Sequence, residues 1–158
     1  DLGFVPAQAS LGVFFARMKD LDKAVLWWTK AATQGDPEAQ YNLGLMYRNG
    51  QGVERDLTTA FHWLSEAAEQ GVVSAQSRVG LMYVTGEGVA MDAIEAQKWF
   101  ILAAQGGDEI SQINLDRSEA LLGLMQIAEA QRRAKAWLKA RGSKSNVSMR
   151  GFTPEFGQ

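Results

Sequence analysis

The side chains best suited to chemistry in this chain are one histidine and a few closely spaced carboxylates. His62 is the sole histidine, and the chain contains no cysteine. A zinc site needs at least three protein ligands, and a serine nucleophile needs a base beside it. One histidine without thiolates does not meet these needs. We therefore predict no metal, no cofactor and no nucleophilic catalysis, and we interpret His62 as a solvent-facing or groove-lining side chain.

Paired carboxylates would suit glycoside hydrolysis, in which two carboxyl groups lie about 5–10 Å apart across a substrate cleft. The candidate pairs are Glu66 with Glu69, Asp108 with Glu109, and Glu54 with Asp56. Glu66 and Glu69 lie beside the apolar pair Ala67-Ala68, so a solvated helix face explains them more simply. Asp56 is explained as a helix cap. The sequence shows no convergent catalytic pair, and we predict that the protein is not an enzyme.

Two Gly-x-Gly motifs, at 50–52 and 86–88, resemble part of a phosphate-binding loop. A dinucleotide fingerprint also requires a third glycine, a strand before it and a helix after it. The third position holds Arg55 in one copy and Met91 in the other, and the preceding segment has a helical pattern. No Gly-x-x-x-x-Gly-Lys-Ser/Thr motif occurs. The motifs are therefore predicted to be structural joints, each followed by a valine, Val53 or Val89, that enters the core.

These joints belong to a repeat with a period of 36 residues. The matching positions are Ala24, Ala60 and Ala96; Trp27, Trp63 and Trp99; Ala31, Ala67 and Ala103; Gly35, Gly71 and Gly107; and Gln40, Gln76 and Gln112. The first unit is shorter, because four residues are missing between Phe15 and Ala24, where later copies hold the joint. A fourth unit loses the glycine pattern after 111–115, as a terminal capping repeat does.

Each unit is interpreted as two helices. In the second unit Asp36 is the expected N-cap, Pro37 the first helical residue, and Gly50 the end of the helix at a positive φ. The second helix is expected to begin after Asp56 and to end at Gly71. Helices are predicted near 5–17, 20–34, 37–49, 56–70, 73–85, 92–105, 109–122 and 125–141.

The repeated tryptophans are predicted to be core residues. Trp27, Trp63 and Trp99 each have alanine three positions before and four positions after them, so one face of the helix combines small and large side chains. Trp28 differs, because its counterparts are Leu64 and Phe100. We predict that Trp28 covers the short first joint or is partly exposed.

The chain resembles the Sel1-like repeat family, a branch of the tetratricopeptide-type α/α solenoids. The residues that carry the resemblance are Ala39-Gln40, Leu43-Gly44, Tyr47, Gly50-x-Gly52-Val53, Asp56, Ala60, Trp63, Ala67-Ala68 and Gln70-Gly71, which recur in the next unit with Val79 in place of Leu43. The resemblance implies an all-α superhelical solenoid of Sel1-like helix pairs with a C-terminal capping helix and a concave inner surface. It also implies an adaptor, assembly or regulatory role, often in bacterial envelope, secretion or signalling systems.

We predict one solenoid domain over 1–141, with units at about 3–34, 35–70 and 71–106 and a degenerate cap at 107–141, followed by a flexible tail at 142–158. The length of 158 residues suits one domain. Residues 129–158 hold 7 basic and 2 acidic side chains, whereas the chain has a net charge of −2. A basic end can contact nucleic acid or anionic lipid, but a solvated helix face and tail are the simpler interpretation, and we expect no nucleic acid.

The predicted function is a protein–protein interaction scaffold that binds another protein or peptide in the concave groove. The first helix of each pair is expected to line the groove, at positions whose residue varies between units. The predicted contact residues are Tyr41, Asn42, Leu45, Arg48, Arg78 and Leu81, with Ser10, Asn114 and Val13 at equivalent positions. The alternatives are an envelope enzyme acting on glycan or β-lactam-like substrates, or a structural module of a longer protein.

We expect a monomer without a transmembrane segment. The resemblance favours the periplasm or another envelope compartment over the cytoplasm. The chain begins with Asp, which we interpret as a processed or truncated start. The identity of the partner, the compartment and the role of the basic C-terminal region do not follow from the sequence.

Overall fold

The structure, a computed structural model, describes residues 4–119 and 122–149, and the side chains at 119 and 143–149 are left out of the description. This part of the chain contains eight helices and no strand. They are α1 (Val5–Arg17), α2 (Leu21–Ala32), α3 (Pro37–Asn49), α4 (Leu57–Glu69), α5 (Val73–Thr85), α6 (Ala93–Gln105), α7 (Glu109–Glu119) and α8 (Leu124–Met149). The predicted helices are therefore confirmed, with the largest differences at the ends of α7 and α8.

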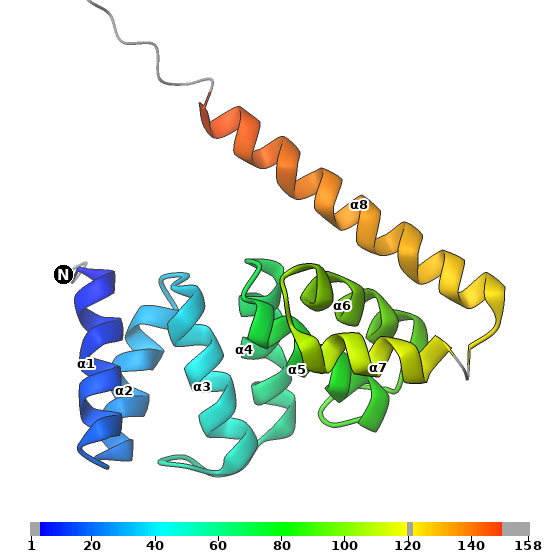
Figure 1. Ribbon diagram of the computed structural model, residues 1–158. Coiled ribbons are helices and arrows are strands. Elements are labelled where there is room, and N and C mark those ends of the chain that lie inside the picture. The colour runs from blue at the N-terminus through cyan, green and yellow to red at the C-terminus, as the bar shows by residue number, and fades with distance from the viewer. Residues whose placement is uncertain (1–3, 120–121, 150–158) are drawn as a thin grey trace, which may run out of the picture.

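Helices α1 to α7 form a solenoid, in which each helix packs against its neighbours in sequence (Figure 1). The closest contacts join α1 to α2, α3 to α4, and α5 to α6. Contacts of α2 with α3, α4 with α5, and α6 with α7 then connect one pair to the next. This arrangement confirms the predicted all-α solenoid of helix pairs, in which each pair completes the core of its neighbour.

The caps that start and end these helices follow the sequence signals. Asp56 and Asp92 accept hydrogen bonds from backbone N–H groups in the first turns of α4 and α6. Asp36 does the same for α3. Gly50 and Gly86 end α3 and α5 in the left-handed region, at φ 67° and 73°, where a side chain is disfavoured. The predicted structural role of the joint glycines is confirmed.

A glycine in the first helix of each pair receives a large side chain from the second helix. A Cβ atom on Gly44 would lie 2.7 Å from Leu64, and one on Gly80 would lie 2.7 Å from Phe100. Gly12 faces the indole of Trp28 in the same way, and a Cβ atom on Gly12 would lie 2.4 Å from the indole ring. The missing side chain therefore sets how closely the two helices of a pair approach.

The contact between Gly12 and Trp28 shows that the prediction of a partly exposed Trp28 was wrong. Trp28 is 4% exposed and belongs to the core, because it occupies the position that faces Gly12. Trp99 is buried as predicted, with 3% exposed. Trp27 and Trp63 are half-buried, so three tryptophans at one repeat position do not have one environment. Trp99 owes its burial to α8, whose Trp137 ring packs edge-on against it at 6.2 Å.

The last two helices depart from the repeated arrangement. Helix α7 packs against α6, but α8 also packs against α6 rather than forming a close pair with α7. Figure 1 shows α8 leaving the stack at an angle. The prediction of a flexible tail from residue 142 was wrong for its first part, because α8 continues to Met149. No proline interrupts 124–149, so nothing stops the helix at 141. Residues 150–158 lie outside the described part.

Candidate functional site

The predicted contact residues of α3 share one side of that helix. Tyr41, Leu45 and Arg48 are four and three positions apart, which places them on a common face. All three are half-buried. Tyr41 and Leu45 pack against the core cluster formed mainly by α4 and α5. Part of each side chain supports the fold, and the remaining surface is available to a partner.

Arg48 links α3 to the joint that follows α5. Its Nε and Nη2 atoms each lie 3.0 Å from one carboxylate oxygen of Glu87. Both side chains remain about 30% exposed. The ion pair fixes the position of a guanidinium at the surface between neighbouring units. A partner carboxylate would have to compete with Glu87 for this group.

The predicted contact residues of α5 and the adjacent units have mixed environments. Arg78 and Leu81 are half-buried, and Leu81 packs against the cluster around Phe100. Ser10 is exposed and donates its hydroxyl to the carbonyl of Pro6. Val13 is 40% exposed. Asn42 is half-buried. The equivalent Asn114 buries its side-chain nitrogen without a hydrogen-bond acceptor in the described residues.

Tyr83 is the titratable group of this region with a perturbed pKa. Its ring packs edge-on against Phe61, with centroids 5.4 Å apart. Burial raises the pKa of the Tyr83 phenol, and the charges of Glu95 and Asp92 raise it further. The raised pKa keeps the phenol protonated at neutral pH.

The carboxylates considered for catalysis have structural roles or face solvent. Asp56 caps α4. Asp108 accepts from the Ser111 backbone N–H at 2.7 Å and from the Ser77 hydroxyl at 2.9 Å. Burial, the largest single influence, raises the pKa of Asp108, but hydrogen bonds from Ser111 and Ser77 lower it on balance. Glu66 is exposed. Glu54 and Asp56 both line a shallow cleft of about 440 Å³ together with Arg55, in which Asp56 is already engaged as the cap of α4.

His62 is exposed and lies beside the Trp63 ring, with ring centroids 4.9 Å apart. The solvent-facing interpretation of this residue is therefore confirmed. In the described residues, no group of three or more His, Cys, Asp or Glu side chains is arranged to hold a metal ion.

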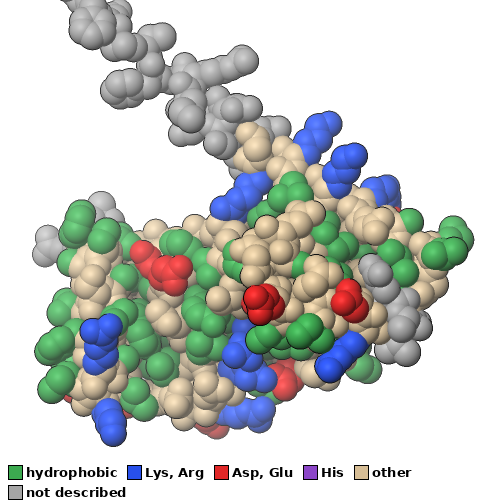
Figure 2. All heavy atoms as spheres, viewed as in Figure 1, with side chains coloured by type: hydrophobic (Ala, Val, Ile, Leu, Met, Phe, Trp, Pro, Cys, Tyr) green, Lys and Arg blue, Asp and Glu red, His purple; other side chains and the backbone are tan. Residues whose placement is uncertain are grey.

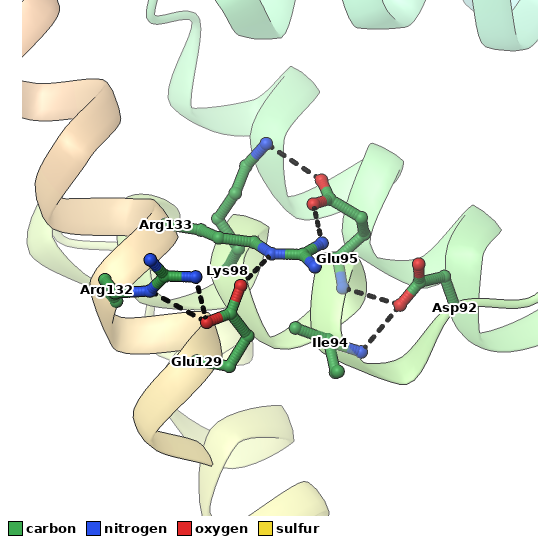
Figure 3. Close-up of polar contacts among 7 residues, drawn as sticks. All are labelled: Asp92, Ile94, Glu95, Lys98, Glu129, Arg132 and Arg133. Carbon is green, nitrogen blue, oxygen red and sulfur yellow. Dashed lines mark hydrogen bonds and ion pairs between the residues drawn. The ribbon is translucent and has the colours of Figure 1, made fainter. Parts of the chain in front are cut away.

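A charged network holds α8 on α6 (Figure 3). Arg133 of α8 contacts Glu95 of α6 at 2.6 Å and Glu129 of its own helix at 2.8 Å. Lys98 and Arg132 contact the same two carboxylates. Hydrogen bonds from Arg133 and Arg132 lower the pKa of Glu129, and those from Glu129 and Glu95 raise the pKa of Arg133. The basic C-terminal region therefore uses part of its charge to attach α8 to the solenoid.

A second set of contacts anchors α8 at the end of α4. The indole N–H of Trp137 donates to the Glu69 carboxylate at 2.6 Å. Arg141 donates to the backbone carbonyls of Glu69 and Gln70, which are free at a helix C-terminus. Glu69, expected to be a solvated carboxylate, instead accepts a hydrogen bond from Trp137. The distance of 68 residues between Glu69 and Trp137 leaves no local signal for it.

The outer side of α1 is apolar and exposed. Ala39 and Ala75 are fully buried in α3 and α5, whereas the equivalent Ala7 is exposed. Phe14, equivalent to the buried Met82, is 55% exposed. Phe4 is 74% exposed. Figure 2 shows hydrophobic side chains gathered over α1 and basic side chains along α8. This side of α1 corresponds to the surface on which α3 and α5 receive the preceding helix.

A family model for the Sel1 repeat matches residues 5–36, 37–72 and 73–108. The chain therefore belongs to the Sel1 repeat family, which is a scaffold fold that generally mediates protein–protein interaction. The three matched segments coincide with the helix pairs α1–α2, α3–α4 and α5–α6. The resemblance inferred from the repeated residues is confirmed.

Solved structures show the same fold. c5321, a protective antigen of uropathogenic Escherichia coli with an SLR fold, superposes with a TM-score of 0.82 at 31% identity, over 99% of this chain and 34% of that one. A Sel1 repeat protein from Oxalobacter formigenes gives a TM-score of 0.69 at 33% identity, over 70% of this chain and 47% of that one. Helicobacter pylori cysteine-rich protein B gives 0.54 at 27% identity, over 56% and 67%.

A shorter similarity extends to a mammalian protein. DAP3-binding cell death enhancer 1 of Rattus norvegicus is 43% identical over 58 residues, which represent 35% of this chain and 11% of that protein. The chain thus spans a small part of this relative and about a third of the c5321 structure. Within residues 4–119 and 122–149, no helix is both long and apolar enough to cross a membrane.

Proposed function

We propose that this protein is a scaffold or adaptor that binds a partner polypeptide on the surface formed by Tyr41, Asn42, Leu45, Arg48, Arg78 and Leu81, called here the inner face. Membership of the Sel1 repeat family is the observation that carries the proposal, because the fold serves protein–protein interaction in that family. A repeat of stacked helix pairs presents successive first helices to one ligand.

The chemistry of the inner face suits a polypeptide ligand. Tyr41 and Leu45 are half-buried. They offer apolar surface from side chains that are held in place by packing against the core. Arg48 and Arg78 add guanidinium groups, and Arg48 is held in place by Glu87. Tyrosine and arginine are enriched among the residues that contribute most to binding energy. Asn42 and Arg78 occupy equivalent positions with different side chains, which supports a role for this position in recognition.

We also propose a bacterial envelope compartment and a monomeric state. The structural neighbours from Escherichia coli, Oxalobacter formigenes and Helicobacter pylori support a bacterial source, and the compartment and the monomeric state are inferred from the resemblance to the family. Fractionation of the source cell checks the compartment, and light scattering checks the mass. Recovery in the cytosolic fraction would contradict the first, and a dimer mass would contradict the second.

The interaction is tested by partner capture with inner-face variants. We expect Arg78→Ala, alone or with Tyr41→Ala, to lose most of the captured partner, since loss of such a residue costs about 2 kcal/mol of binding. Arg17→Ala is the matched control, because Arg17 is an exposed helical arginine outside the face.

A melting curve for each variant separates binding from folding. Tyr41 contacts the core, so its removal can lower stability, whereas Arg78→Ala should melt with the wild type. Undiminished capture by a folded Arg78→Ala, Asn42→Ala double variant would contradict the proposed face. Hydrolysis of a glycan or β-lactam substrate by the purified protein, abolished by a carboxylate substitution, would contradict the scaffold role.

A further inference from the structure

The fourth unit leaves a cleft between α6, α7 and α8. Its volume is about 530 Å³. The apolar residues Ile101, Ala104, Leu115 and Leu138 line it together with Gln112 and Lys135. Gln105 and Leu138 also line a neighbouring cleft of about 360 Å³ that reaches Arg141. The two hollows therefore border α8 continuously, on a surface distinct from the inner face.

The cleft borders the side of α7 that corresponds to the surface packed against the preceding helix in the earlier units. Gln40 and Gln76, at the same repeat position, are each 3% exposed. Each donates its side-chain amide to a backbone carbonyl of the preceding helix. The equivalent Gln112 is exposed and instead donates to Asp116 of its own helix. The surface that another helix covers in units two and three is thus open in α7.

Asp116 explains why α8 does not cover this surface. It stands at the repeat position of Gly44 and Gly80, where a Cβ would meet Leu64 or Phe100 at 2.7 Å. A carboxylate there prevents the same close approach. Helix α8 instead packs on α6 through Ala134 and Trp137, and the space beside α7 remains unfilled.

The charge around the cleft specifies the kind of helix that would fill it. Lys135 stands exposed on the α8 side, whereas Asp116, which accepts a hydrogen bond from the lining Gln112, adjoins the α7 side. Glutamine amides from all three helices supply further hydrogen-bonding groups. An apolar floor with a basic edge is complementary to an amphipathic helix that carries acidic residues beside its apolar stripe.

We propose that the cleft between α6, α7 and α8 binds an acidic amphipathic helix of a partner polypeptide, which lies along α8 without the close approach to α7 that Asp116 prevents. The site rests on the proposed interaction function but not on the inner face. The apolar stripe of the bound helix contacts Leu115, Ile101 and Leu138. Its acidic residues face Lys135, and the continuous hollow toward Arg141 gives the helix its direction along α8.

A synthetic peptide provides the probe. It has about sixteen residues, with leucines at helical spacing and glutamates on both sides of the stripe, and its match carries lysines in place of the glutamates. Fluorescence anisotropy with the full chain measures both. We expect the glutamate peptide to bind and the lysine peptide to bind at least about tenfold more weakly, with the difference reduced at high salt.

Matched variants locate the site. Leu138→Gln and Lys135→Glu should each weaken the glutamate peptide about tenfold. Leu26→Gln and Lys30→Glu on α2 should not, since they alter an exposed leucine and lysine far from the cleft in sequence and fold. Lys135→Glu should also bind the lysine peptide more tightly than the wild type does. All four residues are exposed, so the variants should melt close to the wild type.

Several outcomes would overturn the proposal. These are equal binding of the two peptides, no measurable binding of either, or equal losses in the α2 variants. Self-association of the chain that Leu138→Gln abolishes, without peptide binding, would assign the cleft to a second copy. The Tyr41→Ala, Arg78→Ala variant should bind the glutamate peptide normally. If that variant alone fails to capture the natural partner, the result reports on the inner face. If Leu138→Gln fails to bind the glutamate peptide, the result reports on the cleft.

Discussion

Helices α5 and α6 form a close pair, whereas α7 and α8 do not, although both couples come from consecutive units of one repeat. In the first couple Phe100 lies against Gly80. In the second couple Asp116 replaces the glycine, and α8 is held on α6 by Arg133 and Trp137. The comparison associates close pairing with a glycine that accepts a large side chain, and shows that without this glycine the second helix takes its contacts elsewhere.

The same comparison separates two kinds of repeated residue. The alanines at 60, 67 and 103 are fully buried, because every second helix is covered by the next first helix. The tryptophans at 27, 63 and 99 are not equally buried, because their environment depends on elements outside the repeat. A residue that recurs in every unit therefore has the same environment when its contacts lie within adjacent units. When its contacts lie outside the repeat, recurrence says less about its environment.

The strongest test transfers the residue of the fourth unit into the third. We expect Gly80→Asp to destabilise the fold by about 5 kcal/mol or more, because the new side chain collides with Phe100 and buries a carboxylate without a partner. Chemical denaturation measures the change. A variant with unchanged stability and an intact α5–α6 pair would contradict the role assigned to the glycine.

The next test compares tryptophans at one repeat position. Trp99→Ala should cost about 3–5 kcal/mol of stability, as expected for a buried aromatic residue. Trp63→Ala should cost less, because Trp63 is half-buried. Thermal melts of both variants provide the measurement, and acrylamide quenching of single-tryptophan chains gives an independent one. Equal losses of stability would show that α8 adds nothing at Trp99.

The joint glycines should have smaller effects. Gly50→Val and Gly86→Val should each cost about 1–3 kcal/mol, because a β-branched residue is strained at a positive φ. At both positions, the atoms that an added Cβ would approach belong to the turn that follows the helix. Backbone strain rather than collision with another helix therefore accounts for the loss of stability. Denaturation curves that coincide with the wild type would contradict this explanation.

A milder change loosens α8 without affecting the pairs. Arg133→Gln removes the contacts with Glu95 and Glu129. Hydrogen exchange should show faster exchange of α8 amides and unchanged exchange in α3 to α6. Since exposed ion pairs are screened by salt, the difference from wild type should shrink as salt is added. Equal acceleration in α5 would mean that α8 supports the whole solenoid.

The smallest effect is expected from the reverse substitution. Asp116→Gly should change stability by less than about 1 kcal/mol, because Asp116 is exposed and both residues are poor helix formers. Helix α8 should remain on α6, since Trp137 and Arg133 keep their contacts. Cross-linking between residues introduced on α7 and α8 measures their separation. Closure of α7 on α8 would show that Asp116 alone keeps them apart.

Most of the solenoid could be predicted because its determinants are local. Asp36 with Pro37, and Asp56 with Gly50, mark helix ends within a few residues, and the 36-residue period indicates how units stack. The inner face stays a prediction, made from positions of the first helices that the repeat pattern leaves free to vary. The packing of Tyr41 and Leu45 could not be predicted, because it depends on the neighbouring unit.

The sequence by itself determined the helices, their caps, the repeat and the family. Each of these depends on backbone propensity, hydrogen bonds or side-chain spacing over short distances along the chain. Tertiary structure alone decided the position of α8, the burial of Trp28, the unequal burial of Trp27, Trp63 and Trp99, the clamp formed by Glu69 with Trp137, and the cleft beside α7. They depend on which surfaces remain available after the pairs have packed, and no local pattern records that competition.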